Sequence, residues 1–159
     1  MLSDLGPKSL IEQKELYMRA RALSLLFLRI STGLLCVIWG LIRIAEPKAG
    51  VGVNSKYYGG LMADVSWQTP WGIFLLIVGL LTILGLFRKY AYPLQAAILC
   101  VGALAIWKYL LDPLGLYLLD RESSQVLFFP SLGMAAATLV LITFRSDDAY
   151  ALDVKLGRN

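Results

Sequence analysis

The strongest constraint on this fold is a long apolar stretch without charge, because residues 65–87 contain no Asp, Glu, Lys or Arg. Three further apolar runs are interrupted only by Arg29, Arg43 and Lys108. A helix needs about 20 apolar residues to cross the hydrocarbon core of a bilayer. The pattern therefore predicts an all-α integral membrane four-helix bundle. We expect its spans at about 22–44, 70–87, 90–111 and 124–144.

The composition supports this class of protein. Hydrophobic residues make up 58% of the chain, compared with about 45–50% in ordinary soluble domains. Charged residues make up only 16% and gather at the ends of the apolar runs, whereas a soluble helix carries them along its exposed face. The interpretation is a transmembrane domain over residues 22–145.

Polar segments flank this domain and interrupt it. Residues 1–21 contain Ser9 and Glu12 at capping-box spacing, and their apolar side chains share one helical face: Leu10, Ile11, Tyr17 and Met18. This periodicity predicts an N-terminal amphipathic helix on the membrane surface, with a solvated tail as the alternative. Residues 146–159 are expected to form a polar tail. The loop over residues 45–69 suits either docking to a neighbour or a mobile surface position.

The basic residues give the expected orientation. Nine of them lie on the side that carries both termini in a four-span topology: Lys8, Lys14, Arg19, Arg21, Arg88, Lys89, Arg145, Lys155 and Arg158. Five lie on the other side: Arg43, Lys48, Lys56, Lys108 and Arg121. Cytoplasmic loops carry an excess of Lys and Arg, so both termini are predicted to be cytoplasmic.

Small residues recur at helical spacing in the predicted spans. Gly33 and Gly40 are seven residues apart, as are Gly72 and Gly79. Membrane helices approach closely through such positions. The pattern predicts close helix packing, either within this chain or against another subunit.

Several chemistries are disfavoured by the residue inventory. The chain has no histidine, which removes histidine-ligated haem, zinc and copper sites as well as Ser-His-Asp triads. Cys36 and Cys100 lie in separate apolar runs and form no CxxC motif. We therefore expect no metal or covalent cofactor. The basic residues that give the net charge of +4 flank hydrophobic segments, so they indicate contact with membrane headgroups rather than with nucleic acid.

Arg29 is the first candidate contact residue, because an ionisable residue inside a span is costly and usually faces a partner. One interpretation is a binding site for an anionic or carbonyl-bearing group, such as a quinone head or a lipid phosphate. The other is that the long side chain of Arg29 snorkels to the headgroups.

A second group of candidates is expected at the opposite ends of the spans. Its members are aromatic or charged: Arg43, Glu46, Trp67, Trp71, Trp107, Lys108, Tyr109 and Asp112. Tyr57 and Tyr58 in the 45–69 loop are further candidates for partner contact. Trp and Tyr favour the membrane interface, so an ordinary aromatic belt explains most of them. The alternative is a shallow pocket for a small molecule or a partner's loop. No acid lies in the middle of a span, which disfavours an ion-coupled transporter.

Two segments carry a family resemblance. The first is Leu28-Arg29-Ile30-Ser31-Thr32-Gly33-Leu34-Leu35 with Trp39-Gly40-Leu41-Ile42-Arg43-Ile44, and the second is residues 79–88, GLLTILGLFR. Over about residues 22–145 the chain resembles the DoxX/DoxD-like family, small four-helix membrane proteins with similar "LRxxxG…GxxK" and "GLLLLLGLFTR" patterns. Two features depart from that family. Arg43 stands where a lysine is more usual, and an early acidic residue of the second helix is missing, since residues 74–78 are apolar.

The resemblance implies a role near respiratory or sulfur redox chemistry in a bacterial or archaeal inner membrane, since members include a membrane subunit of thiosulfate:quinone oxidoreductase. It implies a bound quinone or lipid as the ligand, and other membrane subunits or a second copy as partners. The leading hypothesis is an accessory subunit without a catalytic site of its own. The alternatives are a quinone-binding oxidoreductase subunit and a transporter of small molecules or lipids.

Overall fold

The computed structural model describes residues 7–122 and 128–158, and these residues form helices, turns and loops without a β-strand. The predicted all-α class is confirmed at this level. Four long helices form the body of the molecule: α1 (Pro7–Ala45), α3 (Val65–Leu84), α4 (Arg88–Ala105) and α6 (Pro130–Thr143). Shorter elements complete the described part: α2 (Pro47–Tyr57), α5 (Trp107–Leu111), η2 (Arg145–Asp147) and α7 (Leu152–Lys155).

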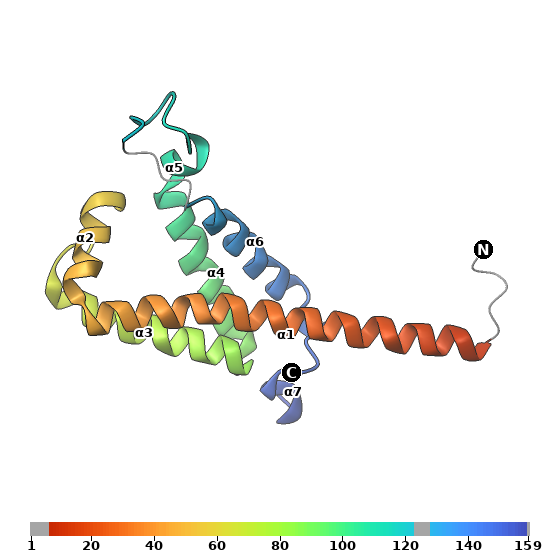
Figure 1. Cartoon of the computed structure of the whole chain (residues 1–159). Helices are drawn as coiled ribbons and strands as arrows, with labels where there is room; N and C mark the ends of the chain where they lie inside the picture. The colour runs from red at the N-terminus through yellow and green to blue at the C-terminus, as the bar shows by residue number, and fades with distance from the viewer. Residues whose placement is uncertain (1–6, 123–127, 159) are drawn as a thin grey trace.

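Helix α1 runs without a break for 39 residues. This differs from the expected turn near residue 21, where a surface helix was predicted to give way to a span. The physical reason is local, because no glycine or second proline occurs between Pro7 and Gly33. Residues 10–20 are exposed, and this part of α1 projects beyond the other helices (Figure 1).

Helices α1 and α3 pack antiparallel through paired glycines. A Cβ atom added to Gly40 would lie 2.6 Å from the carbonyl oxygen of Gly72, and one added to Gly79 would lie 2.7 Å from that of Gly33. Any larger residue would push the two backbones apart. The glycine pattern therefore serves packing within this chain, one of the two alternatives that the sequence left open.

Helices α4 and α6 form a second pair, which rises at a steep angle from α1 and α3 (Figure 1). The helix predicted over 90–111 is broken at Ile106, so that α4 ends at Ala105 and α5 follows. Helix α6 begins at Pro130, and residues 124–127 of the predicted fourth span lie outside the described residues. The stretch 112–122 contains turns rather than a helix.

The predicted loop 45–69 contains the helix α2, which the sequence analysis missed. Pro47 opens it at the first helical position, where a missing N–H is tolerated. Helix α3 then begins at Val65, because the Asp64 carboxylate accepts a hydrogen bond from the N–H of Ser66. Pro70 consequently lies in the second turn of α3, further inside than predicted.

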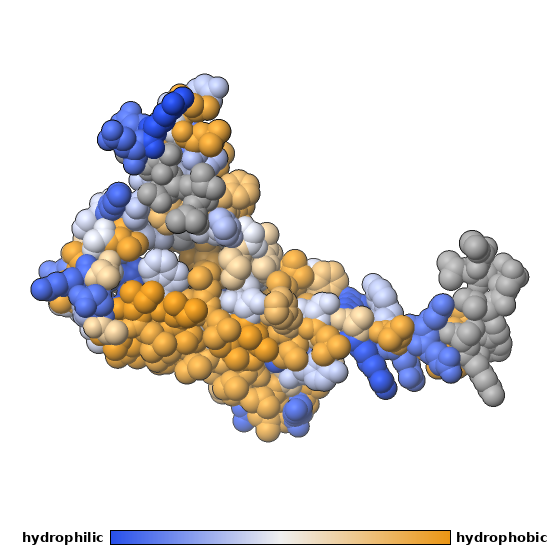
Figure 2. Space-filling view, in the orientation of Figure 1, coloured by the Kyte–Doolittle hydropathy of each residue, from blue (hydrophilic) through white to orange (hydrophobic). Residues whose placement is uncertain are grey.

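Two helices are long and apolar enough to cross a membrane, over Leu10–Ala45 and Val65–Leu84. Most of the apolar surface of these segments faces outward, since only 33% of each apolar window is buried within the molecule. Figure 2 shows this surface as an apolar band along α1 and α3, with hydrophilic residues toward both ends. Exposed leucines and isoleucines also lie on α4 and α6: Leu94, Leu104, Leu132, Leu139 and Ile142.

The segment expected to be a polar tail is folded against the helices. After η2 the chain enters α7, and the backbone N–H of Asp153 donates to the carbonyl of Gly85 at 3.1 Å. Ala151 and Asp148 are fully buried. We call the region around Arg29, Gly85, Arg88 and Asp148 the inner end of the helices, and the region around Arg43, Gln68 and Tyr109 the outer end.

Candidate functional site

Arg29 lies in a buried ion pair at the inner end. Its Nη1 atom donates to both carboxylate oxygens of Asp148, at 3.2 and 3.0 Å, and Nη2 donates to the carbonyl of Tyr150 at 3.4 Å. The hydroxyl of Tyr92 donates to the same carboxylate at 2.5 Å. Arg29, Tyr92 and Asp148 are each at most 2% exposed. The arginine predicted as a contact residue therefore has its counter-ion within this chain.

A second buried pair stands beside the first. The Asp153 carboxylate accepts hydrogen bonds from the backbone N–H groups of Phe87 and Arg88, at 3.1 and 2.8 Å, and lies 3.7 Å from Nε of Arg88. An acidic group is favourable at the N-terminus of a helix, here α4, because the free N–H groups and the helix dipole are positive there. It also supports Phe87, whose φ of 50° is unusual for a residue with a side chain. Asp153 thus fixes the start of α4.

Gly85 makes room for this arrangement at the end of α3. Its φ of 67° lies in the left-handed region that closes many helices. A Cβ atom at this position would overlap the guanidinium of Arg29 and lie 2.7 Å from Cβ of Ala151. Both the backbone conformation and the close approach of the C-terminal segment therefore require glycine here.

The rim of the inner end carries a third pair, between Arg21 and Asp147. Its side chains are 32% and 24% exposed, so solvent screens their attraction. The adjacent residues Asp147 and Asp148 therefore form similar ion pairs in very different surroundings.

The outer end buries Arg43 in a different way. Its Nη1 atom donates to the side-chain oxygen of Gln68, and Nη2 donates to that of Asn54 at 3.0 Å. Arg43 is 6% exposed, and its Nε atom has no hydrogen-bond partner. This guanidinium therefore contacts two neutral amides and no carboxylate in the described part of the chain.

The same two amides organise the loop before α3. The Asn54 side chain donates to the carbonyls of Leu61 and Met62, at 2.8 and 3.1 Å, and the Gln68 side chain donates to that of Met62 at 2.5 Å. Arg43 thus links α1 to α2, to α3 and, through the amides, to the loop between them. This network explains why the 45–69 segment is structured.

An aromatic cluster joins α2 to α5 and to the residues just before α6. The rings of Tyr57, Tyr109 and Phe128 meet edge to face, with centroids 4.7 to 5.4 Å apart. Tyr58 lies nearby, and its hydroxyl is 4.0 Å from the position that a Cβ of Gly102 would occupy. Burial raises the pKa of Tyr58, and the positive charge of Arg43 partly offsets that rise. The phenol is therefore neutral at physiological pH.

Asp112 closes the turn after α5. Its carboxylate accepts four backbone hydrogen bonds, of 2.7 to 3.1 Å, from residues 116–119. Burial alone would raise the pKa of Asp112, but these donors outweigh it and hold the pKa below its usual range. Asp112 is therefore a structural residue.

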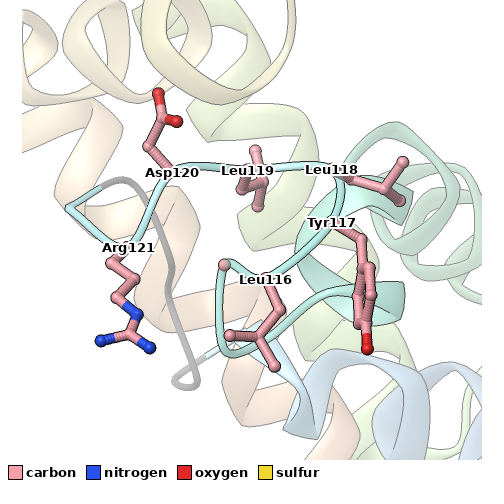
Figure 3. Close-up of a pocket in the computed structure, with 7 residues that line it drawn as sticks. Leu116, Tyr117, Leu118, Leu119, Asp120 and Arg121 are labelled. Carbon is pink, nitrogen blue, oxygen red and sulfur yellow. The ribbon is translucent and has the colours of Figure 1, made fainter.

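A surface pocket of about 530 Å³ lies in the loop over Gly115–Arg121, where Asp120 and Arg121 point to opposite sides (Figure 3).

The other predicted rim residues are separated by the structure. Trp67 and Trp107 are exposed, and Lys108 lies over the ring of Trp107 at 5.9 Å. Trp71 stacks on Phe74 within α3. Glu46 is exposed. Of the predicted residues, four contribute to the outer-end contacts described above: Arg43, Tyr57, Tyr58 and Tyr109. The structure therefore does not assemble one pocket from all ten.

The sequence analysis missed the four buried polar partners of Arg29, Arg43 and Arg88: Asn54, Gln68, Asp148 and Asp153. A signal existed for the aspartates, because three acids follow Arg145 on the side of the membrane where the connection containing Arg88 and the nearer end of the span containing Arg29 are expected. No comparable signal marked the amides. Among the described residues, no group of three or more His, Cys, Asp or Glu side chains could hold a metal ion.

Comparison of the chain with protein-family models, with curated proteins and with solved structures finds no match.

Proposed function

We propose that this chain is a four-helix integral membrane protein that serves as an accessory subunit of a larger membrane complex. Following the DoxX-like pattern around Arg29 and residues 79–88, the complex is proposed to act in quinone-linked redox chemistry of a bacterial or archaeal inner membrane. In this proposal α1, α3, α4 and α6 cross the bilayer and both termini face the cytoplasm. The chain supplies a lipid-embedded scaffold, and the chemistry belongs to its partner.

The observation that carries the scaffold role is the internal pairing of Arg29. A quinone head group or a lipid phosphate would need the guanidinium as a donor, but Asp148 already neutralises its charge, and Asp148 and Tyr150 accept hydrogen bonds from its two Nη atoms. The Arg88–Asp153 pair beside it is likewise closed within the chain. The charged groups of the inner end thus stabilise the fold rather than present a binding site.

The exposed surfaces support the membrane and partner parts of the proposal. Apolar side chains cover the outward faces of all four long helices, and contiguous apolar surface of this kind marks contact with lipid or protein. At the outer end, Trp67 and Trp107 are 57% and 46% exposed. Exposed tryptophans are favourable both at a membrane interface and as anchors in a protein interface.

The test is to express a tagged chain in its native host, extract it in a mild detergent and identify co-purifying proteins and quinones by mass spectrometry. The proposal expects stoichiometric recovery of larger membrane subunits. The double variant W107A/K108A, exposed at the outer end, should lose those subunits and remain folded. A matched control, Y17A/R19A, changes the exposed N-terminal part of α1 and should retain them.

Two results would overturn the proposal. A chain that purifies alone with one bound quinone would make it a quinone-binding protein in its own right. A chain recovered in the soluble fraction after cell lysis would contradict the membrane assignment.

A further inference from the structure

We propose that Arg43 forms a binding site for a phosphate group at the outer end of α1, where the Nε edge of its guanidinium pairs with the oxyanion. The inference is independent of the proposed function, since it concerns a ligand of this chain and not its assembly into a complex. A free phosphate ion and the phosphodiester of a lipid headgroup share the required chemistry.

The argument begins with a comparison of the buried arginines. Arg29 and Arg88 each lie near an aspartate, at 3.0 and 3.7 Å. Arg43 is buried to a similar degree and pairs with no carboxylate in the part of the chain that the structure describes. Glu46, three residues further along the chain, is exposed and forms no ion pair with Arg43. A buried charge without a counter-ion is costly, so an external anion would stabilise this site.

The hydrogen bonds of Arg43 define which of its donors lacks a partner. A guanidinium has five N–H donors. Gln68 and Asn54 accept one bond each from Nη1 and Nη2, and the buried Nε has no hydrogen-bond partner. The Nε atoms of Arg29 and Arg88 also lack a hydrogen-bond partner, so Arg43 differs from them in having no carboxylate beside it. Nε and the neighbouring Nη nitrogen form a planar fork that matches two oxygens of a phosphate.

The surroundings favour an anion. Lys48 and Lys56 of α2 are exposed on the same segment whose Asn54 contacts Arg43. The neutral hydroxyl of Tyr58 is also close enough for the Arg43 charge to lower its pKa. Arginine and lysine side chains are the groups with which proteins bind phosphate, and this region combines a buried guanidinium with exposed lysines.

The first experiment uses the full chain in mild detergent micelles and follows thermal unfolding by tryptophan fluorescence. Inorganic phosphate is titrated against sodium chloride at constant ionic strength. Phosphate should raise the Tm of the wild type and of K48Q, a control that removes a nearby exposed cation. The R43K variant keeps the charge but loses the planar fork, so its apparent Kd for phosphate should rise at least about tenfold.

A second measurement uses only the wild type, so its result does not depend on whether R43K folds. In protein labelled with ¹⁵N-arginine, phosphate should shift the Nε–H resonance of Arg43 and leave those of Arg29 and Arg88 in place. The proposal is overturned if phosphate shifts all three equally, if it shifts none, or if R43K folds and responds like the wild type.

Lipid nanodiscs then distinguish the two sources of phosphate. If discs containing phosphatidylglycerol abolish the response to inorganic phosphate that is seen in phosphate-free detergent micelles, the occupant is a lipid headgroup. If the response persists in the discs, the occupant is a free phosphate ion. A protein whose Tm responds to neither inorganic phosphate nor phosphatidylglycerol would contradict the site.

Discussion

The inner end of the helices buries its arginines beside aspartates, whereas the outer end buries Arg43 against two amides. At the inner end, Asp148 and Asp153 come from the C-terminal segment and neutralise Arg29 and Arg88. At the outer end, Asn54 and Gln68 accept hydrogen bonds from Arg43, but these neutral amides do not neutralise its charge. The two ends therefore use similar cations for different purposes.

The difference teaches how this chain stabilises polar groups in an apolar molecule. A buried ion pair fixes geometry but depends on both partners, because loss of one leaves an uncompensated charge. A guanidinium held by neutral amides loses less when it is removed, since only hydrogen bonds are broken. The inner end is thus expected to be sensitive to charge removal and closed to ligands. The outer end is expected to be more tolerant and open to an anion.

The largest effect should come from breaking the inner pair. Asp148→Asn leaves Arg29 without a counter-ion and should lower the free energy of unfolding by about 3–5 kcal/mol. Asp147→Asn is the matched control, because it removes the partner of Arg21 at a partly exposed position and should cost less than about 1 kcal/mol. Denaturant unfolding of both variants in micelles measures the difference. Equal losses would remove the distinction between the buried pair and the rim pair.

Removing the outer arginine should cost less than breaking the inner pair. Arg43→Met leaves the oxygens of Gln68 and Asn54 each short of one donor, at about 1–3 kcal/mol for each oxygen. The substitution also removes a buried charge that has no counter-ion, and this offsets part of the loss. Arg29→Met, by contrast, strands the Asp148 carboxylate and should resemble Asp148→Asn. The same unfolding assay compares them. If Arg43→Met proved the more damaging of the two, the contrast between the ends would be reversed.

The glycine contacts should behave alike at both ends, because the distance between α1 and α3 is common to them. A Cβ at Gly79 would meet the Gly33 oxygen at 2.7 Å, and one at Gly72 would meet the Gly40 oxygen at 2.8 Å. Each alanine substitution should cost about 1–3 kcal/mol by overpacking. Gly133→Ala in α6 is the control, since nothing lies within 4 Å of its Cβ position. A neutral Gly79→Ala variant would show that the helices are not in close contact.

The smallest effect concerns Asp112 and appears only in acid. Its folded-state pKa is depressed, so its contribution to stability is complete above the unfolded pKa of about 3.9 and is lost as pH falls through the folded pKa. The wild type should therefore lose Tm more steeply than Asp112→Asn below about pH 4, with no difference in slope between pH 5 and 8. The Tm of both proteins is measured from about pH 8 to about pH 2. A difference in slope between them near neutral pH would contradict the prediction.

The helical class, the glycine contacts and the positions of the apolar segments could be predicted from the sequence, because each depends on a local periodicity. Gly33, Gly40, Gly72 and Gly79 are a clear example, since their spacing alone places them on single helical faces. The unbroken course of α1 and the helix α2 were missed. Hydrophobicity marked where a membrane span could begin, but only backbone propensity decided where the helices begin and end.

The polar clusters were predictable only in part, because their partners are distant in the chain. Arg29 was predicted either to bind an anionic or carbonyl-bearing group or to snorkel to the headgroups, whereas its partner in the structure is Asp148, 119 residues away in a segment expected to be a polar tail. Asn54 and Gln68 carry no charge, so no pattern linked them to Arg43 before the fold brought α1, α2 and α3 together. Pairings of this kind follow from tertiary structure and not from spacing.

A double-mutant cycle between Arg29 and Asp148 tests the central claim most directly, namely that the inner end is closed by an ion pair within the chain. Arg29→Met, Asp148→Leu and the double variant are compared with the wild type by denaturant unfolding. We expect the double variant to be more stable than either single variant, with a coupling energy of at least about 2 kcal/mol. Additive losses from the two substitutions would mean that Arg29 and Asp148 do not neutralise each other, and would contradict this account.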